Sequence, residues 1–236
     1  MIFLAIAIVA GAIAQELPPG ASIIERVDIS AIAGVPRTLV LWTPDGKQEV
    51  SGAWWCGTEV YGNWLWRGAF RVSLVDPRRM RIVNTVELEP YLNAVPVSFP
   101  RRSHSFYPTS GLGPGWGSKA RILKLKDLTG NGVKSDFAFF SYESCGNALS
   151  TSLGYDKQTD RVIRYAIEAS GEEPHFWVSQ VFGHKPVKPG VWDFVWDPGH
   201  GAEHMTRLRL RFDKVRRVFV DESIEVPYPF WPNQLR

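Results

Sequence analysis

Thr206-Arg-Leu-Arg-Leu-Arg-Phe212 alternates basic and apolar side chains without a break. Successive side chains of an extended strand point to opposite faces of its sheet. Leu208, Leu210 and Phe212 are therefore predicted to face a core, while the arginines between them face outward. Asp213-Lys214 follows as a turn signal. A period of two over this length predicts a β-strand and excludes an amphipathic helix here.

The same period recurs along most of the chain. No window carries apolar residues at helical spacing over three turns, and turn residues separate the apolar runs. The predicted strands are Thr38 to Thr43, Gly68 to Leu74, Arg81 to Glu89, Ala148 to Tyr155, Arg161 to Glu168, Phe176 to Phe182, Val191 to Trp196, Thr206 to Phe212 and Val215 to Val226. Short strands at this spacing predict an all-β fold of antiparallel sheets, arranged as a sandwich, a barrel or part of a propeller.

The N-terminal segment is apolar and uncharged from Met1 to Ala14, and it ends in the small-x-small pattern Ala12-Ile13-Ala14. These features predict a signal peptide, and the segment is too short to span a bilayer. The alternative is a buried N-terminal strand or helix. Export predicts a periplasmic or extracellular protein with no transmembrane segment after cleavage. The formal net charge of +3 argues against a nucleic-acid partner.

The remaining residues, 15–236, are predicted to form a single all-β domain, because 44% of the chain is hydrophobic and 22% is charged. The stretch from Pro90 to Ser118 is rich in Pro, Gly and Ser, so a subdivision near the 90–118 loop is the alternative. The chain holds two cysteines, Cys56 and Cys145. In an oxidising compartment a lone pair of cysteines predicts one disulfide between them.

The segment Asp127-Leu-Thr-Gly-Asn-Gly-Val-Lys-Ser-Asp136 places oxygen-bearing side chains at alternate positions around glycines. Calcium takes six to eight oxygen ligands, and a short loop can supply them in this way. We therefore predict a weak calcium-binding hairpin loop between strand-like runs, Ala120 to Lys126 and Phe137 to Tyr142. The alternative is a metal-free type I′ hairpin turn at Asn131-Gly132, which is a strong signal for that turn.

This loop resembles the calcium loops of FG-GAP and VCBS repeats, the integrin-α-like family, which run Asp-x-Asn/Asp-Gly-Asp-Gly-x-x-Asp before an apolar strand. Asp127-Leu-Thr-Gly-Asn-Gly matches the first half of that pattern, whereas Ser135 stands where the family has its closing acid. The likeness occurs once and covers under a tenth of the chain. The ligands that it implies are Asp127, Thr129, Asn131, the Val133 carbonyl and Asp136.

Ten tryptophans are present, and several cluster in the N-terminal half. Indoles exposed on a surface stack on sugar rings or on proline-rich peptide, so this cluster is a candidate ligand-binding surface. The alternative is that the tryptophans fill the core. The candidate residues are Trp54, Trp55, Trp64 and Trp66.

Catalytic motifs are missing from the sequence. There is no nucleophile elbow and no phosphate loop, and the histidines of His200-Gly-Ala-Glu-His204 follow Pro198-Gly199, which excludes a zinc-binding helix. The sequence thus favours an exported, non-catalytic binding or structural module of the cell envelope or extracellular space, with a glycan or an envelope protein as partner. A secreted hydrolase of polysaccharide is the competing hypothesis.

Overall fold

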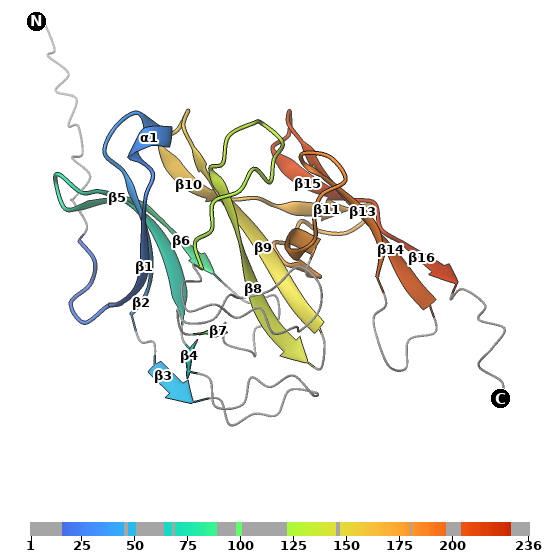
Figure 1. The fold of residues 1–236 in the computed structure, drawn as a ribbon, viewed down its shortest axis with the longest axis horizontal. Coiled ribbons are helices and arrows are strands. Elements are labelled where there is room, and N and C mark those ends of the chain that lie inside the picture. Colours follow the sequence, from blue (N-terminus) through green and yellow to red (C-terminus); the bar gives the residue numbers. More distant parts are fainter. Residues whose placement is uncertain are drawn as a thin grey trace, which may run out of the picture.

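The computed structural model describes residues 16–44, 47–50, 64–67, 69–88, 98–100, 122–144, 147–179, 181–196 and 204–227 (Figure 1). For residues 47–50, 64–67, 98–100, 140–144 and 147–148 it describes the backbone. Nearly all regular structure in these residues is β-strand, and all but one of the strand pairs are antiparallel. The described sheets do not close into a barrel. The all-β prediction is confirmed, and the arrangement is sandwich-like.

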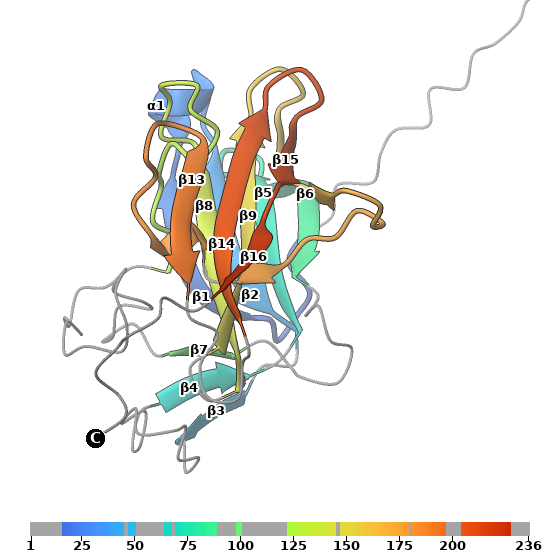
Figure 2. The same cartoon turned by 90° about the vertical axis from the view of Figure 1, so that its right-hand side faces the viewer.

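The first sheet holds four antiparallel strands in the order β1-β2-β5-β6. Its strands are β1 (Ser22–Asp28), β2 (Thr38–Thr43), β5 (Phe70–Asp76) and β6 (Arg81–Leu88), and the one-turn helix α1 (Ser30–Ala33) joins β1 to β2. A small sheet at the opposite end of the molecule from α1 contains β3 (Lys47–Val50), β4 (Trp64–Arg67) and β7 (Ser98–Pro100) (Figures 1 and 2). Among the described residues no helix is long and apolar enough to cross a membrane.

Two further sheets are formed by the second half of the chain. The middle sheet contains β8 (Asp136–Ser144), β9 (Asn147–Asp156), β10 (Arg161–Arg164) and β12 (Val178–Ser179). The third contains β11 (Ile167–Ala169), β13 (Val191–Trp196), β14 (His204–Asp213), β15 (Val218–Asp221) and β16 (Ile224–Pro227). A 3-10 helix, η1 (Val181–Gly183), precedes β13. The β11–β15 pair is the parallel one.

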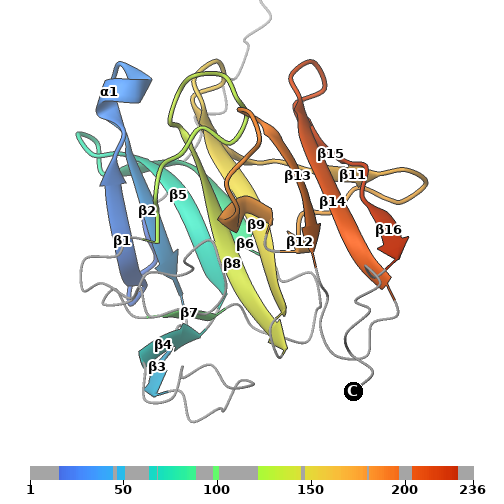
Figure 3. The ribbon, with the colours of Figure 1, turned by 45° about the vertical axis from the view of Figure 1, so that its right-hand side comes forward.

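The middle sheet lies between the other two and has a core on each face (Figure 3). Phe137 and Leu153, which face each other across β8 and β9, pack with the first sheet. On the opposite face Ile163 packs into a second apolar cluster with Leu210 and Phe219 of the third sheet. The first core joins residues from both sides of the 90–118 segment, so the sheets before and after it pack directly on one another.

The alternation in β14 has the predicted faces. Leu208 and Leu210 are buried, and the arginines that alternate with them are partly exposed at 207 and 209 and exposed at 211. Arg207 and Arg209 both bind the carboxylate of Asp193 on β13. The third, Arg211, pairs with Glu222. The outer face of this hairpin is thus an ion-paired surface rather than an unbalanced basic ridge.

Three hairpins end their first strand in the same way. An aspartate closes the strand and accepts a hydrogen bond from the backbone N–H two residues later, and the fifth residue of the turn has a positive φ. The short aspartate side chain replaces a backbone acceptor, which fixes the turn. The aspartates are Asp76, Asp156 and Asp213, and the positive-φ residues are Met80, Asp160 and Arg217.

Arg37 ties two of these turns together. Its Nε donates to Asp160 Oδ1 at 3.0 Å, and its Nη1 lies 3.5 Å from Asp76 Oδ2. Tyr155 Oη donates to the same Asp160 carboxylate at 2.9 Å. The Arg37 side chain is 15% exposed, so these contacts are partly shielded from water. Hydrogen bonding to Arg37 is the largest effect on the pKa of Asp160 and lowers it.

We expect Arg37→Ala to lower the free energy of unfolding by about 1–3 kcal/mol at pH 7, because two carboxylates lose a charged donor. Because the pKa of Asp160 is lower in the folded protein, its contribution is present above the unfolded pKa and is lost as the pH falls through the folded pKa. Urea unfolding should therefore show a smaller difference in free energy of unfolding between wild type and variant at pH 3 than at pH 7. Arg78→Ala, at an exposed turn position, is the control and should change stability by less than about 0.5 kcal/mol.

Candidate binding pocket

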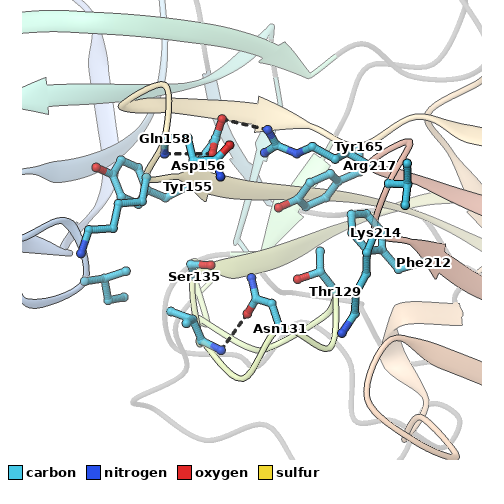
Figure 4. Close-up of a pocket in the computed structure, with 14 residues that line it drawn as sticks. Thr129, Asn131, Ser135, Tyr155, Asp156, Gln158, Tyr165, Phe212, Lys214 and Arg217 are labelled. Atoms are coloured by element: carbon cyan, nitrogen blue, oxygen red, sulfur yellow. Dashed lines mark hydrogen bonds and ion pairs between the residues drawn. The ribbon is translucent and has the colours of Figure 1, made fainter.

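A pocket of about 590 Å³ opens where the loop before β8 meets the β9–β10 and β14–β15 turns. The loop contributes Thr129, Asn131 and Ser135, and the turns contribute cationic side chains (Figure 4). Helix α1 and the β14–β15 turn lie at the same end of the molecule (Figures 1 and 2), and Ile32 of α1 also lines the pocket. The volume lies within the usual range for small-molecule sites.

Beneath the floor of this pocket lies a fully buried carboxylate, Asp136, the first residue of β8. Its Oδ2 accepts hydrogen bonds of 3.0 Å from the backbone N–H groups of Leu128 and Thr129 and from the Thr129 hydroxyl. Its Oδ1 accepts from Tyr165 Oη at 3.0 Å and from Ser135 Oγ at 3.3 Å. Five donors therefore converge on one side chain and hold the loop against β8 and Tyr165.

Burial is the largest influence on Asp136 and raises its pKa, against the opposing effect of its hydrogen bonds. Burial also raises the pKa of Tyr165, and the neighbouring Asp136 charge adds to the shift. Tyr165 is consequently a neutral donor. Gly154, opposite Asp136 in the register, leaves room for this contact, since a Cβ there would overlap Tyr165 Oη and Asp136 Oδ1.

At the rim, Arg217 Nη1 donates to Asp156 Oδ2 at 3.1 Å (Figure 4). Burial acts to raise the pKa of Asp156, but hydrogen bonds from Thr159, Arg217 and the backbone of Gln158 outweigh it and lower the pKa. Arg217 occupies the positive-φ position of its turn, with φ 59°. This backbone conformation turns the chain sharply at the point where its guanidinium meets the β9–β10 turn.

Two lysines complete the rim. Lys214 Nζ donates to the Gly130 carbonyl at 2.8 Å and so joins the β14–β15 turn to the loop. Lys157 is exposed. With Arg217, three cations line the pocket, and Asp156 is the one carboxylate among its lining residues. The lining therefore carries two more positive than negative charges.

The oxygens predicted to bind calcium all take part in hydrogen bonds of the loop itself. The Asp127 carboxylate accepts from the backbone N–H groups of Asn131 and Gly132, at 3.0 and 2.9 Å. Asn131 Oδ1 accepts from the N–H of Val133, and the Val133 carbonyl accepts from Ser135. A calcium ion would have to compete with these bonds. In the described part of the chain, no three His, Cys, Asp or Glu side chains gather in a metal-binding arrangement.

The loop differs from both hairpins predicted for it. Of residues 122–126 only Lys126 pairs with the next strand, in an isolated bridge to Asp136, so no strand precedes the loop in these residues. Gly130 and Gly132 have positive φ, but Asn131 does not. A type I′ turn needs positive φ at both central residues, so the alternative of a type I′ turn at Asn131-Gly132 is not realised. Hydrogen bonds to Asp127 and Asp136 hold the loop instead.

Several predicted site residues fall outside the described residues: Trp54, Trp55, Cys56 and Cys145. The disulfide thus stays a prediction. Trp64 and Trp66 lie two residues apart in the backbone of β4. Trp42 is buried in the first sheet, where its Nε1 donates to Ser73 Oγ at 2.8 Å, so this tryptophan serves the core.

The pocket-forming residues that follow the 127–136 segment were not predicted as a site. Tyr155, Asp156, Tyr165 and Arg217 belong to strands and turns in which no sequence pattern indicated a site. Two of the three similar turns begin with Asp-Lys, at Asp156 and Asp213, and this repeated pair was the available signal. The repeated pair indicates the positions of the turns in the sequence, but it does not indicate that the two turns line the same pocket.

No family model matches the chain, and no curated protein or solved structure is significantly similar to it. The resemblance to FG-GAP and VCBS calcium loops rests on the residues of the loop alone.

Proposed function

We propose that this protein is an exported, non-catalytic binding module of the cell envelope or extracellular space, and that the pocket beside the 127–135 loop is its ligand site. The observation that carries the proposal is the pre-arranged lining. Asp136 fixes the Thr129, Ser135 and Tyr165 hydroxyls by hydrogen bonds before any ligand arrives. A pre-arranged site loses less conformational entropy on binding. Export is supported by the apolar segment from Met1 to Ala14.

Binding is favoured over hydrolysis by the position of the acids. The pKa of Asp136 is raised and that of Asp156 is lowered, and opposite shifts of two carboxyls are typical of an acid and a nucleophile in glycosidases. Asp136, however, is fully buried and does not line the pocket. A general acid must reach the proton acceptor of its substrate within hydrogen-bond distance. Asp136 instead serves to orient the hydroxyls above it.

A glycan array probed with the purified protein tests this function. We expect binding to a defined subset of glycans, with Arg217→Ala reducing the signal several-fold. Arg211→Ala is the matched control, because Arg211 is similarly exposed and ion-paired but lies outside the pocket. Running the array with calcium and with chelator tests the predicted calcium site in the same experiment.

The results separate the alternatives clearly. Equal loss in both arginine variants would place binding elsewhere on the surface, and no bound glycan at all would refute the proposed site. Release of shortened sugars from the array would favour the hydrolase. A signal that disappears with chelator would support a structural calcium ion in the loop.

A further inference from the structure

We propose that the pocket recognises a carboxylate-bearing sugar, such as a uronic acid unit of an acidic polysaccharide. This inference rests on the binding function proposed above and names the ligand class. It follows from two features of the pocket lining: a floor that accepts hydrogen bonds and a rim that is cationic.

The floor presents acceptors. The hydroxyl protons of Thr129, Ser135 and Tyr165 all point to Asp136. A hydroxyl that donates to one partner keeps its lone pairs for others. Thr129, Ser135 and Tyr165 all line the pocket, so the remaining lone pairs of their hydroxyls are the acceptors that its floor offers to a ligand. A ligand with several O–H groups, such as a sugar, matches this floor.

The rim presents donors. The Arg217 guanidinium makes one hydrogen bond among the described residues, to Asp156, although it has five N–H groups. Its side chain is 41% exposed. Lys214 uses one N–H on Gly130, and Lys157 extends from the neighbouring turn. Guanidinium and ammonium groups bind carboxylates through short, charge-assisted hydrogen bonds.

The two sides together exclude simpler ligands. An inorganic anion such as phosphate would satisfy the cations but, with few O–H groups near neutral pH, would set oxygen lone pairs against much of the accepting floor. A neutral sugar would satisfy the floor but leave the excess positive charge of the rim without a counter-charge. The walls add apolar contact, since Val133 and Val215 line the pocket and are 45% and 93% exposed, and the C–H face of a sugar ring can cover them. A sugar acid meets all three requirements.

Calorimetric titration can test this inference with three probes. These are a uronic acid oligosaccharide, the same oligosaccharide with its carboxyls reduced to alcohols, and inorganic phosphate. We expect the acidic oligosaccharide to bind, and its reduced form to bind about ten-fold more weakly or worse, since charge-assisted hydrogen bonds are lost. Phosphate should show no measurable binding. The monomeric uronic acid, added as a fourth titration, separates recognition of a free sugar acid from recognition of a polymer.

Variants locate the charge preference in the pocket. Arg217→Gln and Lys157→Gln should each weaken binding of the acidic oligosaccharide and leave the reduced form unchanged. Lys157 has no hydrogen bond or ion pair among the described residues, so its variant should fold normally and keep the test valid if Arg217→Gln does not. Arg211→Gln is the control that should change neither affinity.

Each result decides a different statement. Equal affinity for the acidic and reduced oligosaccharides would overturn the carboxylate preference and leave the binding function standing. Phosphate binding as tight as that of the acidic sugar would show a simple anion site and overturn the inference. Binding of other glycans but of neither oligosaccharide would also overturn it, whereas failure of every glycan would refute the binding function itself.

Discussion

Asp136→Ala is expected to lower the free energy of unfolding by about 4 kcal/mol or more. The variant leaves the buried backbone N–H groups of Leu128 and Thr129 without an acceptor, and each such group costs about 1–3 kcal/mol. The Tyr165 and Ser135 hydroxyls lose their partner as well. Urea unfolding at pH 7 measures the loss.

Asp136→Asn is the matched variant and should cost much less. The amide oxygen still accepts the two N–H groups, and the amide nitrogen can donate to hydroxyls that turn to accept it. Burial raises the pKa of Asp136 above its unfolded value, so this carboxyl binds a proton more readily in the folded protein than in the unfolded chain. The stability that this proton binding contributes is fully present below the unfolded pKa of about 3.9. It is lost as the pH rises through the pKa of the folded protein. The free energy of unfolding of the asparagine variant should therefore rise relative to that of wild type between pH 3 and pH 7. Equal losses of stability in the Ala and Asn variants would show that Asp136 does not organise the loop.

Strands that stay within one sheet could be predicted from the sequence. Thr38–Thr43 and Val191–Trp196 have the predicted bounds, because each is a short apolar run that turn residues terminate. The predicted strand Arg161 to Glu168 is instead divided into β10 and β11. β10 pairs with β9 in the middle sheet, and β11 pairs with β15 in the third. The chain changes sheets between them, and no local period signals such a crossing.

A strand with an irregular period could not be predicted. In β1, Ile24 and Glu25 are adjacent and both buried, with a register shift between Ile23 and Glu25. The irregularity turns the Glu25 carboxylate inward, where its Oε2 accepts from the backbone N–H of Ile122 at 2.7 Å. This buried carboxylate is stabilised by the hydrogen bond from Ile122, which lies 97 residues away in the sequence. A pattern read over a short window contains no trace of that partner.

The same limit applies to the pocket. The 127–136 segment could be identified as unusual from its residues, but its chemistry depends on Tyr165 and Arg217, which reach it from other strands and turns. Its two acids do different things in the fold. Asp127 closes the loop on its own backbone, and Asp136 joins the loop to the middle sheet. A sequence pattern for calcium ligands cannot distinguish an oxygen that is free for a metal from one that already accepts an N–H.

Gly130→Ala is expected to have the second largest effect, a loss of about 2–5 kcal/mol in the free energy of unfolding. Gly130 has φ +69°, where a side chain costs about 1–2 kcal/mol, and a Cβ there would lie 2.6 Å from the Pro189 carbonyl oxygen. Relieving this overlap requires the backbone to move, which adds about 1–3 kcal/mol. The contact is mutual, since a Cβ at Gly190 would lie 2.8 Å from the Thr129 carbonyl oxygen.

Gly132→Ala separates the two causes of that loss. Gly132 has φ +86°, but a Cβ there would meet no atom within 4 Å, so this variant should lose about 1–2 kcal/mol from backbone strain alone. The difference between the two variants, measured by urea unfolding, is the cost of separating the loop from the 188–190 segment. Lys214 donates to the Gly130 carbonyl, so Gly130→Ala should also displace a rim cation and weaken ligand binding, whereas Gly132→Ala should leave the affinity unchanged. Equal losses of stability in the two variants would mean that the loop is not packed against Pro189, and the pocket would then lack the fixed wall on which its pre-arranged lining depends.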